Sequence, residues 1–241
     1  MFGSLANVCI YRMPKNKSIV FNRSACPHCR RTIVWYYNIP VVSFLLLKGK
    51  SHCCNKKINL QYLAVELLTA ILFYLNAVLF PTNQAMLLSG ITFFLIVIFY
   101  VDLKHQIIFD IFPYLLLVSG LLINFYPKLN PFSINVLNSF LSAMISTLLF
   151  LLIRYLFKKI KNKEGMGLGD IKLIAGLSAW TGFESFLYIL TISSLIGILY
   201  FLTFPKNKKK GEDIYIPYGS CLSFAFMILL YFNSSLLQNL I

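Results

Sequence analysis

The sequence predicts an all-α membrane protein: a polytopic bundle of about seven to eight transmembrane helices with a small cytoplasmic, cysteine-containing, zinc-ribbon-like segment. Of its 241 residues, 58% are hydrophobic and 12% are charged, and the mean hydropathy is +0.73. These values lie well outside the usual range for a soluble domain. A membrane-spanning helix needs about 20 mostly apolar residues, and seven runs reach or approach that length. They are residues 62–81, 85–101, 107–126, 134–157, 170–183, 185–204 and 218–238.

The chain divides into three parts along its length. Residues 1–11 are apolar but make barely half a span before Arg12, so we expect a partial first membrane helix, or a re-entrant or interfacial piece. They have neither the basic leading region nor the small-residue cleavage site of a secretory signal peptide. Residues 12–60 form a polar, cysteine-containing cytoplasmic segment, and residues 61–241 form the helical membrane domain.

The formal net charge of +14 indicates membrane topology rather than nucleic-acid binding. When the seven spans are threaded alternately through a bilayer, all 22 lysines and arginines except Lys128 fall on one side. The positive-inside rule makes that side cytoplasmic, and basic residues there attract anionic lipids. We therefore expect a multi-pass membrane protein whose basic side faces the cytoplasm, that contacts membrane lipids and binds no nucleic acid.

The cysteines of the cytoplasmic segment suggest a structural zinc site. Cys26 and Cys29 form a C-x2-C knuckle, and Cys53 and Cys54 follow as an adjacent pair. Two thiol pairs supply the four ligands of a structural zinc ion, and a cytoplasmic location disfavours a disulfide. Because adjacent cysteines seldom bind one metal together, His52 or a water molecule is an alternative fourth ligand. An unmetallated turn is the other interpretation.

Two aspartates suggest acid/base chemistry at the inner edge of the membrane. Asp102 ends the apolar run 85–101, and Asp170 follows Gly167 and Gly169 at the start of another run. The threading places both at cytoplasmic helix ends, at the same depth. Two carboxyl groups held together cannot both ionise cheaply, so one keeps a proton while the other activates water. The glycines permit close backbone approach.

Each acid also has a purely structural interpretation. Asp170 is positioned to cap its helix, and Asp102 to pair with Lys104. Asp110 is an alternative partner for Asp102, or a supporting acid beside the pair. Glu66 lies about one turn into a predicted span, where a hydrogen bond to a polar group on another helix is the expected role.

The chain resembles the type IV prepilin peptidases over almost its full length. Five motifs in order carry the resemblance, which is more specific than the G-x-G-D pattern alone. They are Gly3 to Pro14, similar to G-S-F-x-N-V-x-I-x-R-x-P; Cys26 to Cys29 with Asn38 to Ser43, similar to C-P-x-C and N-I-P-x-x-S; Asp102 to Asp110; Gly167 to Asp170; and Ile216 to Gly219, similar to I-P-F-G.

The resemblance implies a multi-pass enzyme of the bacterial cytoplasmic membrane with two activities. It would cleave the short basic leader of prepilins or pseudopilins at the cytoplasmic face, and then methylate the new N-terminus with S-adenosylmethionine. It makes residues 61–241 a GxGD aspartic peptidase domain, with Asp102 and Asp170 as catalytic aspartates. It also makes Cys26, Cys29 and Cys54 zinc ligands. The methyl donor rests on the resemblance alone, because the sequence contains no glycine-rich loop for it.

This chain departs from the family pattern in three places. Ser51 stands where the third cysteine usually falls, so Cys53 would take its place as a zinc ligand. Phe109 replaces the proline that precedes Asp110, which removes a helix-start constraint but leaves both acids. The third departure is the short first apolar run, where the family usually has a complete first helix among eight.

Three other functions stay open from the sequence. A preflagellin-type GxGD peptidase without methyltransferase activity would share the aspartates, although the cysteine segment argues against it. A non-enzymatic, proton-coupled carrier would use Asp102 and Asp110 for ion coupling. A membrane-bound zinc or thiol protein would use both acids only structurally.

Overall fold

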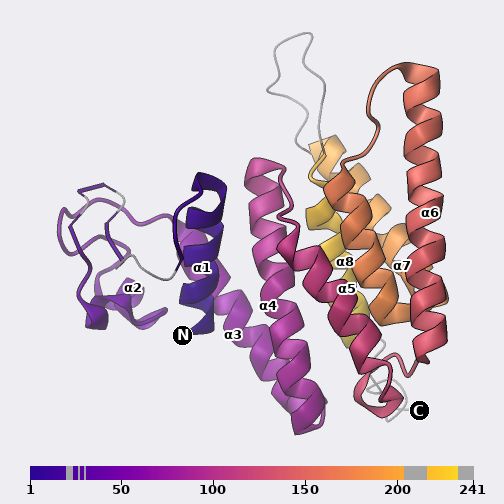
Figure 1. The fold of residues 1–241 in the computed structure, drawn as a ribbon. Helices are drawn as coiled ribbons and strands as arrows, with labels where there is room; N and C mark the ends of the chain where they lie inside the picture. Colours follow the sequence, from indigo (N-terminus) through magenta and orange to yellow (C-terminus); the bar gives the residue numbers. More distant parts are fainter. Residues whose placement is uncertain (20–23, 27, 30, 204–215, 233–241) are drawn as a thin grey trace. The chain divides into compact units, whose positions relative to one another are not determined.

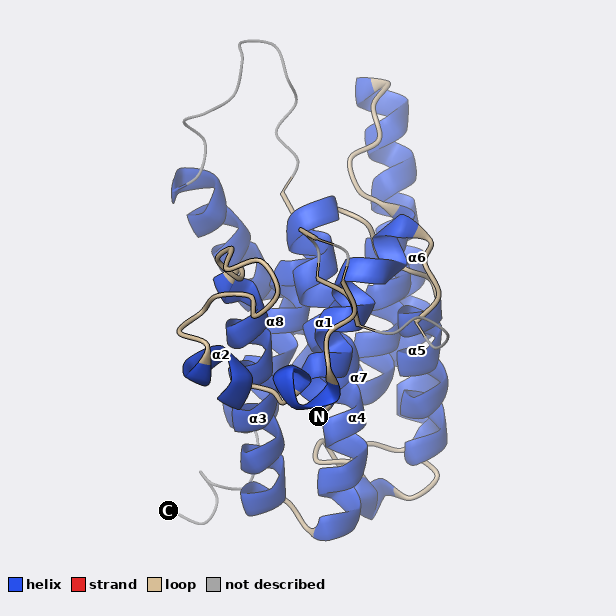
Figure 2. Cartoon of the chain, turned by 90° about the vertical axis from the view of Figure 1, so that its left-hand side faces the viewer, coloured by secondary structure: helices blue, strands red, loops and turns tan. Residues whose placement is uncertain are grey.

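The fold is known from a computed structural model, which describes residues 1–19, 24–26, 28–29, 31–203 and 216–232. Figure 2 shows helices and loops in these ranges and no strand. The eight α-helices found there confirm the predicted all-α fold. The chain forms two compact units, residues 1–97 and 98–241, and the boundary lies inside α4 (Thr82–His105). The predicted boundaries after residues 11 and 60 stay a prediction.

In the first unit, a short helix packs directly on a long one. Helix α1 (Phe2–Arg12) contacts α3 (Leu60–Leu79). A Cβ added to Gly3 would lie 2.7 Å from Cα of Glu66, so only glycine permits this approach. Between these helices lie loops and three short elements, which are η1 (Met13–Lys15), η2 (Trp35–Asn38) and α2 (Val42–Leu46).

In the second unit, the helices gather around α7 (Leu168–Thr203), as Figure 1 shows. Its neighbours are α5 (Ile111–Ile123), α6 (Val136–Lys161) and α8 (Tyr218–Phe232), with η3 (Pro127–Leu129) between α5 and α6. Small residues on α7 permit the contact. A Cβ at Gly176 would lie 2.9 Å from Cβ of Leu116 on α5.

Helix α7 is two membrane segments joined at a break. Its 36 residues would extend about 54 Å at about 1.5 Å per residue, almost twice the hydrocarbon thickness of about 30 Å. Gly182 interrupts it with φ 73° and ψ 168°, a conformation that favours glycine. The two halves correspond to the predicted runs 170–183 and 185–204, which meet at a break of one residue, Gly182.

The break frees carbonyl groups inside the bundle, and neighbouring side chains bind them. In a continuous helix, the carbonyls of Ala179 and Trp180 would accept from N–H groups beyond Gly182. Here the Asn124 amide donates to the Ala179 oxygen (3.0 Å), the Asn130 amide donates to the Trp180 oxygen (2.9 Å), and the Ser139 hydroxyl donates to the Ala179 oxygen (2.6 Å). Irregular backbone at membrane depth needs such partners, because hydrocarbon offers none.

The remaining helices lie near the predicted apolar runs but differ from them in length. Four helices are long and apolar enough to cross a membrane among the described residues, namely α3, α4, α6 and α7. Helices α5 and α8 are apolar but shorter. Helix α5 begins at residue 111 rather than 107, because residues 106–109 form an irregular segment with φ 54° at Gln106, followed by a turn at Asp110. The end of the predicted run 218–238 lies outside the described residues.

Candidate active site and candidate metal centre

Asp102 lies in the last turn of α4 and is held by the start of α8. Its side chain is buried. Oxygen Oδ2 accepts hydrogen bonds from the backbone N–H of Ser220 (2.7 Å) and from the Ser220 hydroxyl (3.1 Å). The first N–H groups of a helix have no partner within the helix, so the carboxyl group satisfies one of them. The predicted alternative, an ion pair with Lys104, does not occur in the described residues.

Asp170 lies in the first turn of α7 and is partly buried. Its carboxyl group faces the backbone N–H of Gly167, the residue before the helix, in the manner of a capping box. The carboxyl group of Asp170 therefore does cap α7, from the third residue of the helix. The same carboxyl group also faces the backbone N–H of Gly219, which belongs to α8.

The N–H of Gly219 brings the two aspartates together. It faces both carboxyl groups, and Asp170 lies near enough to Asp102 for their charges to interact. A side chain at Gly219 would displace its neighbours, because a Cβ there would lie 3.2 Å from Asp102 Oδ2 and 2.5 Å from Ile108 Cδ1. Gly169 is equally confined, since its Cβ would lie 3.0 Å from Ile108 Cβ. Asp102 and Asp170 thus face the same backbone N–H group, and their action as a catalytic pair stays a prediction.

Asp110 pairs with a lysine and not with Asp102. Its Oδ1 forms an ion pair with Nζ of Lys172 at 2.7 Å, and its side chain is 59% exposed. Lys172 also lies over the ring of Tyr114 on α5. Asp110 therefore ties the start of α5 to the second turn of α7, two residues after Asp170, rather than pairing with Asp102.

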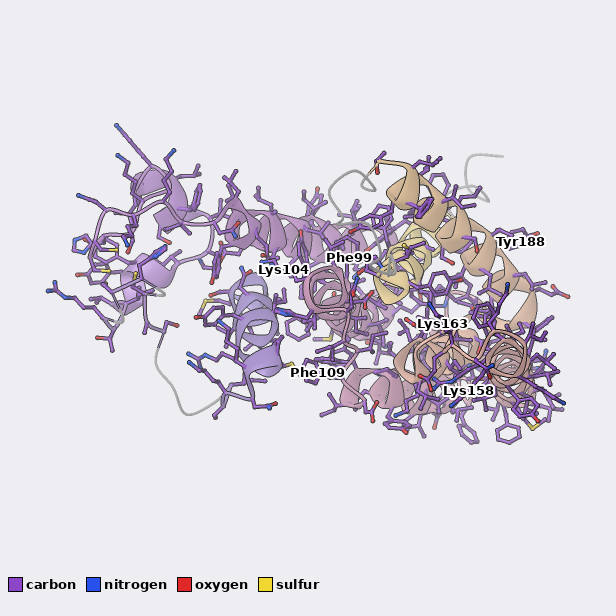
Figure 3. All side chains as sticks on the ribbon, turned by 90° about the horizontal axis from the view of Figure 1, so that it is seen from above. Phe99, Lys104, Phe109, Lys158, Lys163 and Tyr188 are labelled. Carbon is purple, nitrogen blue, oxygen red and sulfur yellow. The ribbon has the colours of Figure 1, made fainter. Side chains whose placement is uncertain are left out.

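The loop before the G-x-G-D motif is clamped to the end of α6. Arg154 forms an ion pair with Glu164 (2.9 Å) and donates to the carbonyl of Met166 (3.1 Å). Lys158, labelled in Figure 3, contacts the same carboxylate at 3.4 Å. The Arg154 charge lowers the pKa of Glu164. These contacts fix the path of the loop that leads into α7.

Ser220 is the site residue that the sequence did not reveal. The resemblance singles out the segment Ile216 to Gly219, and α8 begins within it, at Tyr218. A hydroxyl residue in the first turn of a helix, directly after that motif, was the available signal. Its partner lies 118 residues earlier in the chain, and nothing in the local pattern identifies such a partner.

Glu66 occupies a separate position in the first unit. Its Oε2 accepts from the backbone N–H of Val41 at 2.8 Å, and its carboxyl group also interacts with the side chain of Asn7 on α1. The predicted hydrogen bond to a polar group on another helix is therefore present. Glu66 is the one acidic residue among residues 1–97, and it joins two of the motifs that the sequence singled out.

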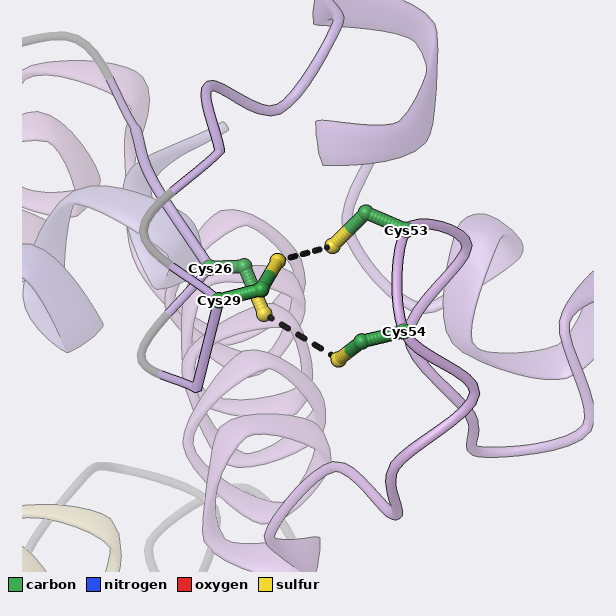
Figure 4. A group of neighbouring side chains, drawn as sticks. All are labelled: Cys26, Cys29, Cys53 and Cys54. Atoms are coloured by element: carbon green, nitrogen blue, oxygen red, sulfur yellow. Dashed lines mark hydrogen bonds between the residues drawn. The ribbon is translucent and has the colours of Figure 1, made fainter.

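Four thiols converge in the loop region of the same unit. Each pair lies in a short hairpin, one closed by a bridge between Ala25 and Thr32, the other by a bridge between Lys50 and Lys57. The sulfur atoms of Cys26, Cys29, Cys53 and Cys54 all lie within 4.8 Å of one another (Figure 4). The adjacent cysteines therefore do point to one centre.

The spacing of the sulfurs fits a tetrahedral metal. With Zn–S bonds of about 2.3 Å, tetrahedral thiolates lie about 3.8 Å apart. The Cys26 to Cys54 distance is 3.8 Å, whereas Cys29 and Cys53 are 2.9 Å apart and would separate on binding a metal. His52 stacks on Tyr37 instead (centroids 4.1 Å apart) and is not in the group.

Ser51 supports the thiols without replacing one. Its hydroxyl lies 3.4 Å from the sulfur of Cys26 and 3.1 Å from that of Cys53. Burial by itself would raise the pKa of Cys26, but hydrogen bonds from Ser51 and from the backbone of Cys29 and His28 outweigh it and lower the pKa to about 5. A thiolate is the form that binds metal.

Comparisons with known proteins give consistent matches to both parts of the chain. Residues 1–80 match the family model "Bacterial Peptidase A24 N-terminal domain", and residues 88–202 match the model "Type IV leader peptidase family". No solved structure matches.

Curated relatives match over nearly the whole chain. The "Type 4 prepilin-like proteins leader peptide-processing enzyme" of Escherichia coli is 30% identical over 253 residues, with 97% of this chain and 91% of that protein covered. Two proteins named "Prepilin leader peptidase/N-methyltransferase" are similar. That of Vibrio cholerae is 30% identical (96% and 92% covered), and that of Dichelobacter nodosus is 33% identical (93% and 86% covered).

Proposed function

The chain belongs to the type IV leader peptidase family, and on that premise we propose that it is a membrane aspartic endopeptidase that removes the leader peptide from prepilins or pseudopilins. The observation that carries the proposal is the convergence of Asp102 and Asp170 on the N–H of Gly219. Four long apolar helices make the chain an integral membrane protein.

The mechanism that we propose uses the two aspartates as one unit. A water molecule between them loses a proton to one carboxylate and attacks the scissile carbonyl carbon, while the other carboxyl group gives its proton to the carbonyl oxygen. The C–N bond then breaks, and the nitrogen takes the proton that came from the water. Because the carboxyl groups interact, the pair titrates with pKa values that belong to both.

We place the aspartate pair at the cytoplasmic edge of the cytoplasmic membrane. Supporting this, the α6–α7 loop, in which Lys163 precedes the G-x-G-D motif, belongs to the basic side of the alternating topology. Anionic lipids would bind this basic surface. The substrate leader is expected to be basic too, so the exposed carboxylate of Asp110 and the lipid headgroups would offset part of the repulsion.

A structural zinc ion and a methyl donor complete the proposal. Cys26, Cys29, Cys53 and Cys54 would hold zinc, which would fix the two hairpins in place. The relatives are named N-methyltransferases, which supports methylation of the new N-terminus with S-adenosylmethionine. No described residue forms a recognisable binding loop for that donor, so no step is assigned to it. The match over residues 1–80 favours this function over a preflagellin-type peptidase without that segment.

The test is a cleavage assay on the purified chain in lipid. The protein is incubated with a prepilin and S-adenosylmethionine, and mass spectrometry measures loss of the leader and the mass of the new N-terminus. We expect both changes with the wild type and neither with Asp102→Asn or Asp170→Asn. Glu184→Gln, an exposed acid beyond the break in α7, serves as the matched control. Normal processing by either aspartate variant would exclude the mechanism, and leader loss without the methyl group would remove the transferase.

A further inference from the structure

The two aspartates receive different hydrogen bonds. Asp102 Oδ2 is approached by two donors from Ser220, the backbone N–H at 2.7 Å and the hydroxyl at 3.1 Å. Asp170 faces backbone N–H groups, those of Gly167 and Gly219, and among the described residues it receives no hydroxyl donor. The two members of the pair are therefore not equivalent, because their carboxyl groups receive different donors.

Ser220 is fixed in place and cannot easily turn away. Its side chain is 2% exposed, and its hydroxyl also lies 2.8 Å from the carbonyl oxygen of Phe99, one turn before Asp102 on α4. The hydroxyl has one proton to share between these two oxygens. The backbone N–H has no such choice, so Oδ2 of Asp102 is an acceptor and not the oxygen that carries a proton.

Among the described residues, the other groups around Asp102 do not provide a compensating cation. From α7 the charged neighbour is Asp170, and from α8 the neighbours are the N–H of Gly219, Ser220 and the thiol of Cys221. Ile108, in the irregular segment after α4, lies against Gly219 and Gly169 with its apolar side chain. Lys104 and His105 follow Asp102 on its own helix and are exposed. The α8 donors are thus the direct contacts that stabilise a negative charge on Asp102.

We infer that Ser220 is a positioning residue that holds Asp102 as the carboxylate, so that Asp102 is the base and Asp170 carries the proton of the pair. This inference rests on the proposed function. Asp102 takes a proton from water as the water oxygen bonds to the carbonyl carbon, and Asp170 protonates the carbonyl oxygen. When the C–N bond breaks, Asp102 gives its proton to the nitrogen, and Asp170 recovers one from the hydroxyl that becomes the new carbonyl.

The test compares two serines of the same helix. Ser220→Ala removes the hydroxyl donor but keeps the backbone N–H. Ser223→Ala removes the hydroxyl of another buried serine, one that makes no hydrogen bond within the described residues. Ser220→Thr keeps the hydroxyl. Each variant is assayed for leader cleavage over a pH series, with kcat and KM measured separately.

We expect Ser220→Ala to lower kcat about tenfold, because a hydrogen bond to a charged group is lost, and to change KM less than twofold. The acidic limb of its kcat/KM profile should move to higher pH, since a carboxylate with one donor fewer takes up a proton more readily. Ser220→Thr should recover most of kcat, and Ser223→Ala should match the wild type.

Two results would overturn the inference. One is an unmoved acidic limb in Ser220→Ala, and the other is an equal loss in Ser220→Ala and Ser223→Ala, which would indicate a packing effect. The proposed function fails separately, if the wild type itself does not cleave. Alanine is smaller than serine and favours helices, so Ser220→Ala is expected to fold, and its zinc content and thermal transition check this independently.

Discussion

The two compact units hold their reactive groups by different physical means. In residues 98–241, the acids sit in helix turns whose positions come from packing, with Gly176 against α5 and Gly219 against Ile108. In residues 1–97, the thiols sit in short hairpins and loops with little regular structure. A small loop region of this kind buries too little apolar surface to order itself, and a metal ion commonly supplies the missing stability.

The two sites should therefore respond differently to the loss of one side chain. The aspartate pair depends on helices that were assembled by many contacts, so removing one carboxyl group should affect chemistry and leave the fold intact. The thiol cluster depends on four ligands, so removing one should affect the local fold. Substitutions at the two sites should separate these two outcomes.

The largest effect is expected at the aspartate pair. Asp102→Asn or Asp170→Asn should lower leader cleavage by about 10³-fold or more, because one member of an acid/base pair that acts as a unit is lost. Zinc content should stay at the wild-type value, measured by metal analysis of the same preparation. Loss of zinc together with activity would mean that the two units are not independent.

The next effect concerns the metal. Cys26→Ser should lower the zinc content to below about a tenth of the wild type, because three thiolates bind a structural metal far more weakly than four. Limited proteolysis should then cut within residues 31–59. Cys9→Ser, a buried cysteine of α1 outside the cluster, is the control. Full zinc retention in Cys26→Ser would contradict the four-thiolate site.

A third prediction compares two glycines. Gly219→Ala should lower cleavage about tenfold or more, because the added Cβ would meet Ile108 Cδ1 at 2.5 Å and Asp102 Oδ2 at 3.2 Å. Gly90→Ala, with nothing within 4 Å of the added atom, should stabilise α4 by about 1 kcal/mol. Thermal unfolding and cleavage assays measure both variants. Equal behaviour of the two would show that the space around Gly219 is not restrictive.

The fourth prediction concerns the polar network at the break in α7. Asn124→Ala should destabilise the protein by about 1–3 kcal/mol, because the carbonyl of Ala179 loses a donor inside the bundle. The thermal transition should fall while kcat of the remaining folded protein stays near the wild-type value. A change in kcat without a change in stability would place this network in the catalytic site.

The smallest effect is expected for Asp110. Asp110→Asn removes an ion pair with Lys172 in which the carboxylate is largely exposed, and such pairs contribute little. Cleavage should change by less than about threefold, and KM for a basic leader should rise more at low salt than at high salt. A loss as large as that in Asp102→Asn would return Asp110 to the catalytic pair.

Much of the fold followed from composition and the lengths of the apolar runs alone. Apolar length is a local property, so the spans near α3, α4 and α6 were predictable, as was the division of α7 into two. The ends of α5 and the one-residue break at Gly182 were not, because they depend on which carbonyls find donors on other helices.

The residue types that make acid/base and thiol chemistry possible, and their order, could be read directly from the sequence. The distribution of basic residues also predicted the side of the membrane. Tertiary structure alone decided the partners: Asp170 rather than Asp110 for Asp102, Cys53 rather than His52 for the thiol cluster, and Ser220 for the carboxylate. Motifs record local chemistry, whereas hydrogen bonds and ion pairs between distant segments arise only when helices pack and bring their ends to one place.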